Sequence, residues 1–335
     1  MTDESSRPYF VSSQVAIEVF DWCEAVSRLQ VAYAANNDLK ATPSRTIAAS
    51  GTAILRCLPA VPVGERYFGI KVMGWDKGAP NPAAQYVIIL FDRETSRIVA
   101  FVDADKVTGF RTAATSAAAL DKIAPAGPLR LAVLGSGVEA TMHVRAFSAV
   151  RDLAEITVFS PTPARREAFS REIGAELGVA AKAVASPEDA VRDADIVLAA
   201  ARSHGEKPIL YGGWIKQGAV IVSIGSTVPS QREVDASVVA KADVIVCDVV
   251  SEVLEETGDM IAAAKAGIDA QSKCYPIEAL MRGELSEQLA AARNPMFKSV
   301  GGGLQDVVVA GMVFDRALAA GKAVGLPIDI SAKLL

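Results

Sequence analysis

The sequence predicts an α/β fold in which a mixed α+β segment is followed by a parallel sheet with crossover helices. From residue 129 to about 250, apolar runs that read as strands alternate with helical patterns, which is typical of such a sheet. The first 125 residues instead place one helical pattern before several short strands, and Pro125-Ala-Gly-Pro128 separates the two parts. A length of 335 residues suits two domains.

The N-terminal part is expected to begin with one helix over 14–36, which ends at Asn36-Asn37. Asp92-Arg-Glu-Thr95 predicts a hairpin turn between two later strands. An alanine-rich pattern predicts a helix from about Thr108 to 123. The strands expected between these helices are 45–49, 52–58, 67–74, 85–91 and 97–102.

The second part carries the alternating pattern. Ser186-Pro-Glu-Asp189 is a good helix start, with a capping serine, a proline and two acids in the first turn. Residues 251–295 are less regular, and a last helix over about 304–320 is closed by Gly321. The expected strands are 129–134, 154–159, 181–184, 195–200, 219–224 and 243–247, with helices at 137–150, 163–177 and 187–193.

The composition excludes several classes of protein. The net charge of −5 comes without a basic cluster, so we expect no nucleic-acid partner. No apolar run approaches the roughly 18–20 residues that span a bilayer, and the N-terminus is polar and acidic. We therefore expect a cytoplasmic protein without membrane contacts. Four scattered cysteines and two histidines, His143 and His204, predict neither a disulfide nor a metal site.

The most specific motif is Leu129-Arg-Leu-Ala-Val-Leu-Gly-Ser-Gly-Val-Glu-Ala140, a buried strand that ends in Gly-x-Gly-x-x-Ala and enters a helix. Gly135 allows the tight turn, and Gly137 lets the backbone approach a pyrophosphate. The first helical residues, Val138 and Glu139, then offer backbone N–H groups to the phosphates. In this context we interpret the motif as a dinucleotide site, and an ordinary tight turn is the alternative.

The end of the next strand bears on the choice of cofactor. NAD enzymes usually place an acid there for the ribose hydroxyls, but this chain has Ser160 in the run Phe159-Ser-Pro-Thr-Pro-Ala-Arg-Arg166. Thr162 and Arg165 follow at once and could contact the cofactor. The missing acid and the nearby arginines favour NADP(H) over NAD(H), although both arginines could instead be solvated helix residues.

Three cations of the N-terminal part could form an anion site. Lys71 lies in an otherwise apolar strand, where a lysine faces either solvent or a site, and the pattern alone favours solvent. Arg111 is expected in the first turn of a helix, where a bound anion would offset the unfavourable dipole. Arg45 precedes a strand. Their spacing does not show that they converge.

With these motifs in order, the chain resembles the ornithine cyclodeaminase/mu-crystallin family over nearly its whole length. The resemblance begins with Pro43-Ser-Arg45, Lys71 and Thr108-Gly-Phe-Arg-Thr-Ala-Ala-Thr115. It continues with Gly135-Ser-Gly-Val-Glu-Ala140, Asp195-Ile-Val, Lys207-Pro-Ile-Leu, Ile224-Gly-Ser-Thr-Val-Pro229, Glu233-Val-Asp235, Thr257-Gly-Asp259, Ser299-Val-Gly301 and Asp306.

The resemblance implies a Rossmann-type dinucleotide-binding domain, residues 126–304, inserted into an α+β domain of residues 1–125 plus 305–335. The α+β domain would bind substrate and form a homodimer. Arg45, Lys71 and Arg111 would hold the carboxylate of an amino or imino acid, with Lys71 as proton donor or acceptor and Val300 beside the substrate. Further cofactor contacts would come from Arg111, Thr112, Ala201, Gly225, Ser226 and Ser299.

Two positions depart from the ornithine cyclodeaminases of this family. These use a glutamate where this chain has Arg56, in Leu55-Arg-Cys-Leu-Pro59, and an aspartate where it has Thr227. Both acids that would engage a diamino acid are therefore missing, and each such charge-assisted contact is worth roughly 1.5–3 kcal/mol. Arg56 could meet a second acidic group of the substrate or could be a solvated strand residue. Thr227 could hold a water that takes part in proton transfer.

These residues favour NAD(P)H-dependent reduction of an α-imino acid to an amino acid. The substrate would be a cyclic ketimine, such as 1-pyrroline-2-carboxylate or 1-piperideine-2-carboxylate, or the linear imine of a 2-oxo acid. A cyclodeaminase that recycles NAD⁺ is the first alternative. A crystallin-like protein that binds NADPH and a small ligand without turnover is the second.

Overall fold

The computed structural model describes residues 7–201, 207–331 and 333, and confirms the α/β fold. The chain forms two compact units, residues 1–112 with 302–335 and residues 113–301. The helix α3 (Ala104–Ile123) contains the point where one unit passes into the other. The domain limits predicted from the sequence, after residues 125 and 304, stay a prediction. His204 lies outside the described residues.

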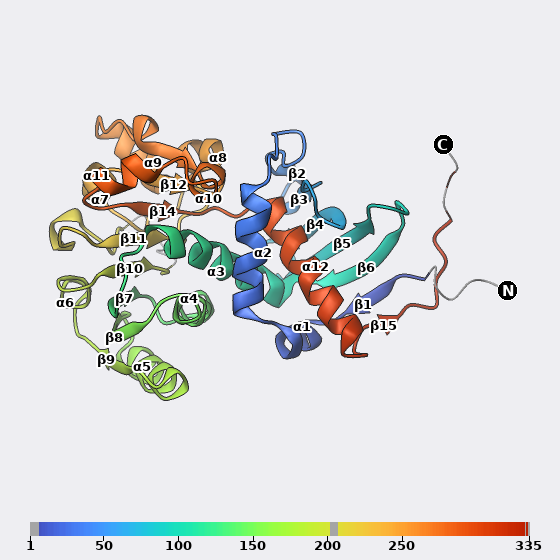
Figure 1. The fold of residues 1–335 in the computed structure, drawn as a ribbon, viewed down its shortest axis with the longest axis horizontal. Helices are drawn as coiled ribbons and strands as arrows, with labels where there is room; N and C mark the ends of the chain where they lie inside the picture. Colours follow the sequence, from blue (N-terminus) through green and yellow to red (C-terminus); the bar gives the residue numbers. More distant parts are fainter. Residues whose placement is uncertain (1–6, 202–206, 332, 334–335) are drawn as a thin grey trace. The chain divides into compact units, whose positions relative to one another are not determined.

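The first unit is built on a mostly antiparallel sheet with the strand order β15-β1-β6-β5-β4-β3-β2 (Figure 1). Two of these strands were not predicted, because each is very short: β1 pairs parallel with β6 and antiparallel with β15. The bounds are β1 Tyr9–Val11, β2 Thr46–Ser50, β3 Ala53–Ala60, β4 Tyr67–Asp76, β5 Ala84–Asp92, β6 Ile98–Asp103 and β15 Val324–Gly325.

The predicted single helix over 14–36 is wrong, because the chain forms α1 (Ser13–Val19) and α2 (Trp22–Ala34). Asp21 separates them with an extended backbone, and its carboxylate accepts a hydrogen bond from the N–H of Glu24 at 2.9 Å. A side-chain cap of this kind starts a new helix and therefore ends the previous one.

The helix α12 (Gly303–Ala319) packs on the sheet of the first unit and runs beside α2 (Figure 1). Two glycines allow the close approach. A Cβ on Gly303 would lie 2.5 Å from the carbonyl oxygen of Pro59, and one on Gly311 would lie 2.8 Å from the ring of Tyr67. The first turn of α12 therefore lies directly against β3, and its middle lies directly against β4.

The second unit is built on a parallel sheet with the order β13-β12-β14-β11-β10-β7-β8-β9. The order reverses at β7, with β8 and β9 on one side and β10 and β11 on the other, which is the topological switch point of Rossmann-type sheets. The bounds are β7 Leu129–Leu134, β8 Leu153–Phe159, β9 Ala180–Ala183, β10 Ile196–Ala199, β11 Val220–Ser223, β12 Ile245–Cys247, β13 Cys274–Pro276 and β14 Met296–Lys298.

The α-helices of the second unit are short apart from α4 and α5, and the apolar residues of β10, β11 and β12 form its core with them. Their bounds are α4 Val138–Ser148, α5 Pro163–Leu177, α6 Pro187–Val191, α7 Ala236–Lys241, α8 Val250–Glu256, α9 Gly258–Lys265, α10 Ile277–Met281 and α11 Ser286–Ala291. Short 3₁₀ turns cover Gly212–Trp214 and Gln271–Lys273. In the described part of the chain, no helix is long and apolar enough to cross a membrane.

Candidate active site

The glycine loop lies at the switch point of the parallel sheet. Gly135 has a φ of +125°, and a Cβ there would lie 2.7 Å from the carbonyl oxygen of Ala200, which follows β10. Its N–H donates to the carbonyl of Phe159 at the end of β8 at 2.8 Å. The loop thus connects the ends of three neighbouring strands in a conformation that favours glycine.

The start of α4 fits a dinucleotide phosphate. Gly137 is the N-cap, no described side chain caps it, and no described atom lies within 4 Å of the Cβ that Gly137 lacks. Val138 is 64% exposed, and Glu139 turns along the helix, with its carboxylate 3.9 Å from Nδ1 of the buried His143. The backbone N–H groups of this first turn therefore face space that an anion can enter.

Ser160 is buried beside the glycine loop. Its Oγ accepts a hydrogen bond from Ser136 Oγ at 2.9 Å, and its carbonyl accepts one from the Arg166 guanidinium at 2.9 Å. Arg166 also lies over the ring of Phe159, 5.8 Å from its centroid. Thr162 and Arg165 are exposed. Of the two arginines, Arg166 is held by the protein and Arg165 extends into solvent.

A buried carboxylate, Glu233, joins the ends of β10 and β11. One of its oxygens accepts the N–H of Ala201 at 2.8 Å. The other accepts the N–H of Gly225 and the hydroxyl of Ser223, both at 2.9 Å. A Cβ on Gly225 would lie 2.3 Å from this carboxylate, so only glycine fits there. Glu233 therefore fixes two of the predicted cofactor contacts, Ala201 and Gly225.

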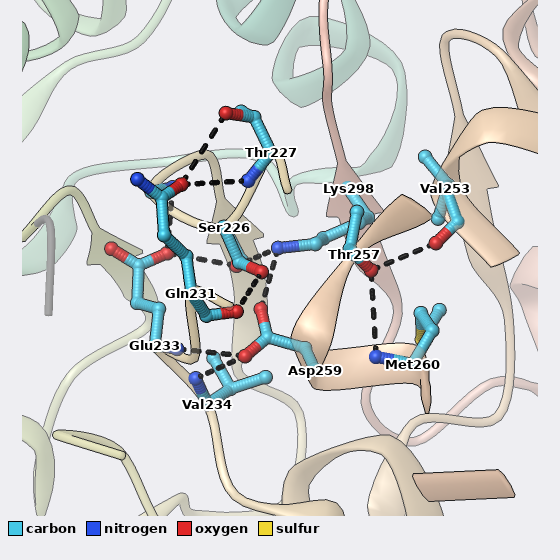
Figure 2. Close-up of polar contacts among 12 residues, drawn as sticks. Ser226, Thr227, Gln231, Glu233, Val234, Val253, Thr257, Asp259, Met260 and Lys298 are labelled. Atoms are coloured by element: carbon cyan, nitrogen blue, oxygen red, sulfur yellow. Dashed lines mark hydrogen bonds and ion pairs between the residues drawn. The ribbon is translucent and has the colours of Figure 1, made fainter. Parts of the chain in front are cut away.

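Behind Glu233 lies a buried ion pair. Lys298 Nζ is 2.7 Å from Asp259 Oδ2 (Figure 2). It also donates to Ser223 Oγ at 2.9 Å, and both charged side chains are fully buried. The other oxygen of Asp259 accepts the backbone N–H groups of Glu233 and Val234 at 2.7 and 3.1 Å. Burial raises the pKa of Glu233 to about 8, and Lys298 opposes that rise.

Ser226 was predicted to contact the cofactor and Thr227 to take part in proton transfer. Both belong to the loop that follows β11. Ser226 Oγ donates to the carbonyl of Gln231 at 2.6 Å, and the N–H and hydroxyl of Thr227 lie 3.3 and 3.4 Å from the side-chain oxygen of Gln231 (Figure 2). Thr227 is half-buried. The loop is closed by its own hydrogen bonds, in which the hydroxyl of Thr227 takes part.

Asp248 holds the segment after β14. Its carboxylate accepts the hydroxyl of Ser299 at 2.6 Å and the N–H groups of Val300 and Gly301 at 3.0 and 2.7 Å. All of these contacts are buried. The predicted positions Ser299 and Val300 therefore have a fixed backbone.

The first unit brings three charged side chains together. Lys71 Nζ donates to Asp306 Oδ1 at 2.8 Å, and Arg111 Nε lies 3.0 Å from the same oxygen. Arg111 also donates to the side-chain oxygen of Gln305 at 2.8 Å. Burial, Arg111 and Arg45 lower the pKa of Lys71 to about 8, although Asp306 opposes them. A lysine with such a pKa exchanges a proton readily near neutral pH.

Two interpretations from the sequence pattern are wrong. Lys71 does not face solvent: it is 1% exposed, because β4 lies between β3 and β5 and α12 covers this face. Arg111 is not in the first turn of its helix, because α3 begins at Ala104 directly after β6. Arg111 is buried by its pairing with Asp306 and Gln305, not placed by a helix dipole.

Three further predicted residues belong to this unit: Arg56 on β3, Arg45 just before β2, and Thr112 on α3 beside Arg111. Arg56 pairs with Met73 across β3 and β4, and its guanidinium lies over Trp75, 5.4 Å from the ring centroid. Arg45 is half-buried just before β2 and near enough to affect Lys71. Thr112 Oγ1 donates to the carbonyl of Thr108 one turn earlier at 2.7 Å.

Several buried charged residues of the site were not predicted from the sequence to take part in binding or catalysis. Asp306, Glu233 and Asp259 were landmarks of the resemblance, whereas Lys298 and Asp248 were not. The available signal was the one that marked Lys71, a charge inside an apolar run, as in Met296-Phe-Lys298. In the described part of the chain, no group of three or more His, Cys, Asp and Glu residues could hold a metal ion.

Comparison with known proteins identifies relatives along most of the chain. The chain is 29% identical to the mouse ketimine reductase mu-crystallin over 284 residues, which are 82% of this chain and 84% of that protein. It is 28% identical to a Δ1-pyrroline-2-carboxylate reductase of Bacillus cereus over 271 residues, 79% of this chain and 82% of that protein.

A solved structure of Thermococcus litoralis Δ1-pyrroline-2-carboxylate reductase, in complex with NADH and L-proline, matches with a TM-score of 0.81 at 25% identity. The match covers 96% of this chain and all of that one. The model of the ornithine cyclodeaminase/mu-crystallin family matches residues 11–321. The chain therefore belongs to the ornithine cyclodeaminase/mu-crystallin family.

Proposed function

We propose that this protein is an NAD(P)H-dependent reductase that converts an α-imino acid to an amino acid. The observation that carries the proposal is the buried Lys71, which lies beside Arg111 and Asp306 and has a pKa near 8. Reduction of a C=N bond needs a proton as well as a hydride, and this lysine can exchange one. The relatives named as ketimine and pyrroline-carboxylate reductases support the same chemistry.

The substrate-binding residues would be the cations of the first unit. Arg111 and Arg45 bind the carboxylate, because guanidinium groups form paired hydrogen bonds with carboxylates. Asp306 holds Lys71 and Arg111 at 2.8 and 3.0 Å and so fixes the direction of both side chains. Lys71, or a water that it holds, gives the proton to the imine nitrogen. Orientation in a buried site supplies much of the rate.

The dinucleotide would be held by the second unit, and when bound its reduced nicotinamide supplies the hydride to the imine carbon. The N–H groups of Val138 and Glu139 bind the pyrophosphate. Ser160, Thr162 and Arg165 meet the adenosine ribose. The backbone fixed by Glu233 and Asp248 meets the rest of the cofactor, with contacts at Ala201, Gly225, Ser226, Ser299 and Val300.

The proposal is tested by following NADPH and NADH oxidation by absorbance with 1-pyrroline-2-carboxylate, 1-piperideine-2-carboxylate, and 2-oxo acids mixed with ammonia or methylamine. Ornithine and lysine with NAD⁺ are run beside them for ammonia release. We expect steady oxidation with at least one imine. Ammonia from a diamino acid without net NADH change would favour the lyase, and silence in both assays would favour a binding protein.

The pH dependence should follow Lys71. Its pKa of about 8 lies below its usual value, so the proton is present below pH 8 and lost above it. Reduction consumes that proton, so kcat for the imine should fall by about tenfold per pH unit above about pH 8. Oxidation of the amino acid needs the deprotonated lysine, so its rate should rise up to about pH 8 and level off above it. Paired pH profiles of both directions check this, and two flat profiles would remove Lys71 from the chemistry.

The preference for NADP should depend on Arg165. Its side chain is exposed beside Ser160, whereas Arg166 is held by the Ser160 carbonyl and Phe159. Arg165→Gln should weaken NADPH binding by about tenfold and leave NADH binding within about twofold, because a charge-assisted phosphate contact is worth about 1.5 kcal/mol or more. Titration of both cofactors by fluorescence checks it. Equal loss for both would contradict a 2′-phosphate contact.

We also propose a homodimer through the open face of the first unit's sheet. Half-buried apolar side chains pair across β4 and β5 on the face opposite Lys71, including Ile70 with Ile89 and Phe68 stacked on Phe91. Continuous apolar faces of this kind mark interfaces. Ile89→Glu should convert the dimer into a monomer in size-exclusion chromatography with light scattering. A wild-type monomer would contradict the proposal.

A further inference from the structure

Two cysteines that the proposed function does not use lie on neighbouring strands of the parallel sheet. β12 and β13 pair with Ile245 opposite Cys274, and Cys247 lies two positions further along β12. Because side chains alternate along a strand, Ile245, Cys247 and Cys274 share one face of the sheet. Both cysteines also pack in one apolar cluster, Cys247 as a buried member and Cys274 at its margin. The fold therefore brings together two thiols that are far apart in the sequence.

The two thiol groups interact directly. A hydrogen bond with Cys247 lowers the pKa of the Cys274 thiol, whereas burial raises the pKa of the Cys247 thiol. Cys274 is half-buried and Cys247 is fully buried. Since the thiolate is the reactive form of cysteine, Cys274 is the thiol that a small reagent reaches and oxidises first. Cys247 is then the neighbouring thiol that can react with the oxidised sulfur.

A bond between the two sulfurs requires only a small movement of β13. Diagonal neighbours on paired strands are about 7–8 Å apart, and the Cα atoms of a disulfide are roughly 4.4–6.8 Å apart. β13 has three residues and lies at the edge of the sheet, where it pairs with β12. Cys274 is its first residue and directly follows the 3₁₀ turn Gln271–Lys273. A short edge strand beside a turn can move by this amount while the rest of the sheet stays in place.

We propose that Cys247 and Cys274 form an oxidation site whose substrate is a hydroperoxide. The Cys274 thiolate attacks one oxygen of hydrogen peroxide, the O–O bond breaks, and the leaving hydroxide takes up the thiol proton to form water. The sulfenic acid then reacts with the Cys247 thiol: the S–S bond forms, the S–O bond breaks, and a second water leaves. Two thiols and one peroxide thus give one disulfide and two waters, and a dithiol reductant reverses the change.

The disulfide would close a loop of the second unit that carries two buried carboxylates. Asp248 follows directly after Cys247 and accepts the hydroxyl of Ser299 at 2.6 Å. Asp259 lies further along the same loop and pairs with Lys298 at 2.7 Å. The oxidation site is therefore built into the segment that holds β14 and the residues after it, and it can be tested without turnover.

The first test treats the reduced, full-length protein with a few equivalents of hydrogen peroxide. The remaining thiols are alkylated in denaturant, and the peptides are analysed by mass spectrometry. We expect a linked pair of peptides that contains Cys247 and Cys274, and we expect dithiothreitol to separate it. Cys274→Ser should abolish the linked pair, whereas Cys23→Ser, at an exposed cysteine of α2, should keep it. Wild-type protein in which both cysteines are alkylated after peroxide, or in which Cys274 is oxidised only to a sulfinic acid, would overturn the proposal.

The second test measures whether the two thiols can be bridged without oxidation. Phenylarsine oxide binds two neighbouring thiols with the loss of one water. The reduced wild type and Cys23→Ser should each bind one equivalent through Cys247 and Cys274, as seen by intact-mass spectrometry and peptide mapping. Cys274→Ser should bind none while its melting temperature stays close to that of the wild type. Equal binding by Cys274→Ser, or no binding by the wild type, would contradict a paired site.

Discussion

Replacement of Lys71 by methionine is expected to lower kcat for imine reduction by about 100- to 10,000-fold, the usual contribution of a positioned general acid. Methionine has a similar length and fills the same buried space. Asp306 keeps Arg111 as a partner at 3.0 Å, so the substitution does not leave an isolated buried charge. NADH binding, followed by fluorescence, should stay within about twofold of the wild type, since Lys71 belongs to the other unit from the glycine loop.

The matched control is Lys77→Met, an exposed lysine beyond the end of the same strand. It should reduce the imine at the wild-type rate. Full turnover by Lys71→Met would show that the proton reaches the imine by another route, and Asp306 or ordered water would then have to supply it.

Replacement of Lys298 by methionine should produce the largest loss of stability, about 3–5 kcal/mol, which is the usual cost of removing one partner of a buried ion pair. Lys298 and Asp259 are 2.7 Å apart with fully buried side chains, and Glu233 lies in the same network. The variant leaves the buried carboxylate of Asp259 without its cation. Urea denaturation followed by fluorescence measures the change.

Lys182→Met is the control for this variant. Lys182 pairs with Glu155 on the surface of the same unit, where the two side chains are 58% and 31% exposed, and such pairs contribute about 0–1 kcal/mol. If Lys298→Met unfolded at the same urea concentration as this control, the buried pair would not hold the ends of β11 and β14 together.

The parallel sheet could be predicted from the sequence because each early strand is an apolar run of several residues with a clear turn after it. The glycine loop could also be predicted, since Gly135 and Gly137 lie between a predicted strand and a predicted helix. The strand β14 was missed, because it has three residues and ends in Lys298. Its place between β11 and β12 depends on long-range pairing that no local pattern carries.

The candidate site was predictable only in part. The pattern marked Lys71 as unusual, but its partner Asp306 lies 235 positions further along the chain and meets it because Gly303 lets α12 approach β3. The break at Asp21 was missed because capping competes with helical periodicity over only a few residues. The early start of α3 was missed because the helix follows β6 with no turn residues between them. The expectation that Arg45, Lys71 and Arg111 lie together came from the resemblance to the family, because their spacing in the sequence does not show it.

The most direct test of the account is the fate of the hydride. The protein is incubated with an imine that it consumes and with NAD(P)H deuterated at C4 on either face, and the amino acid formed is analysed by mass spectrometry. A net reductase must place one deuterium on the α-carbon, from one face of the nicotinamide, with one cofactor oxidised per product. Amino acid without deuterium, or ammonia released from a diamino acid without net cofactor oxidation, would contradict it.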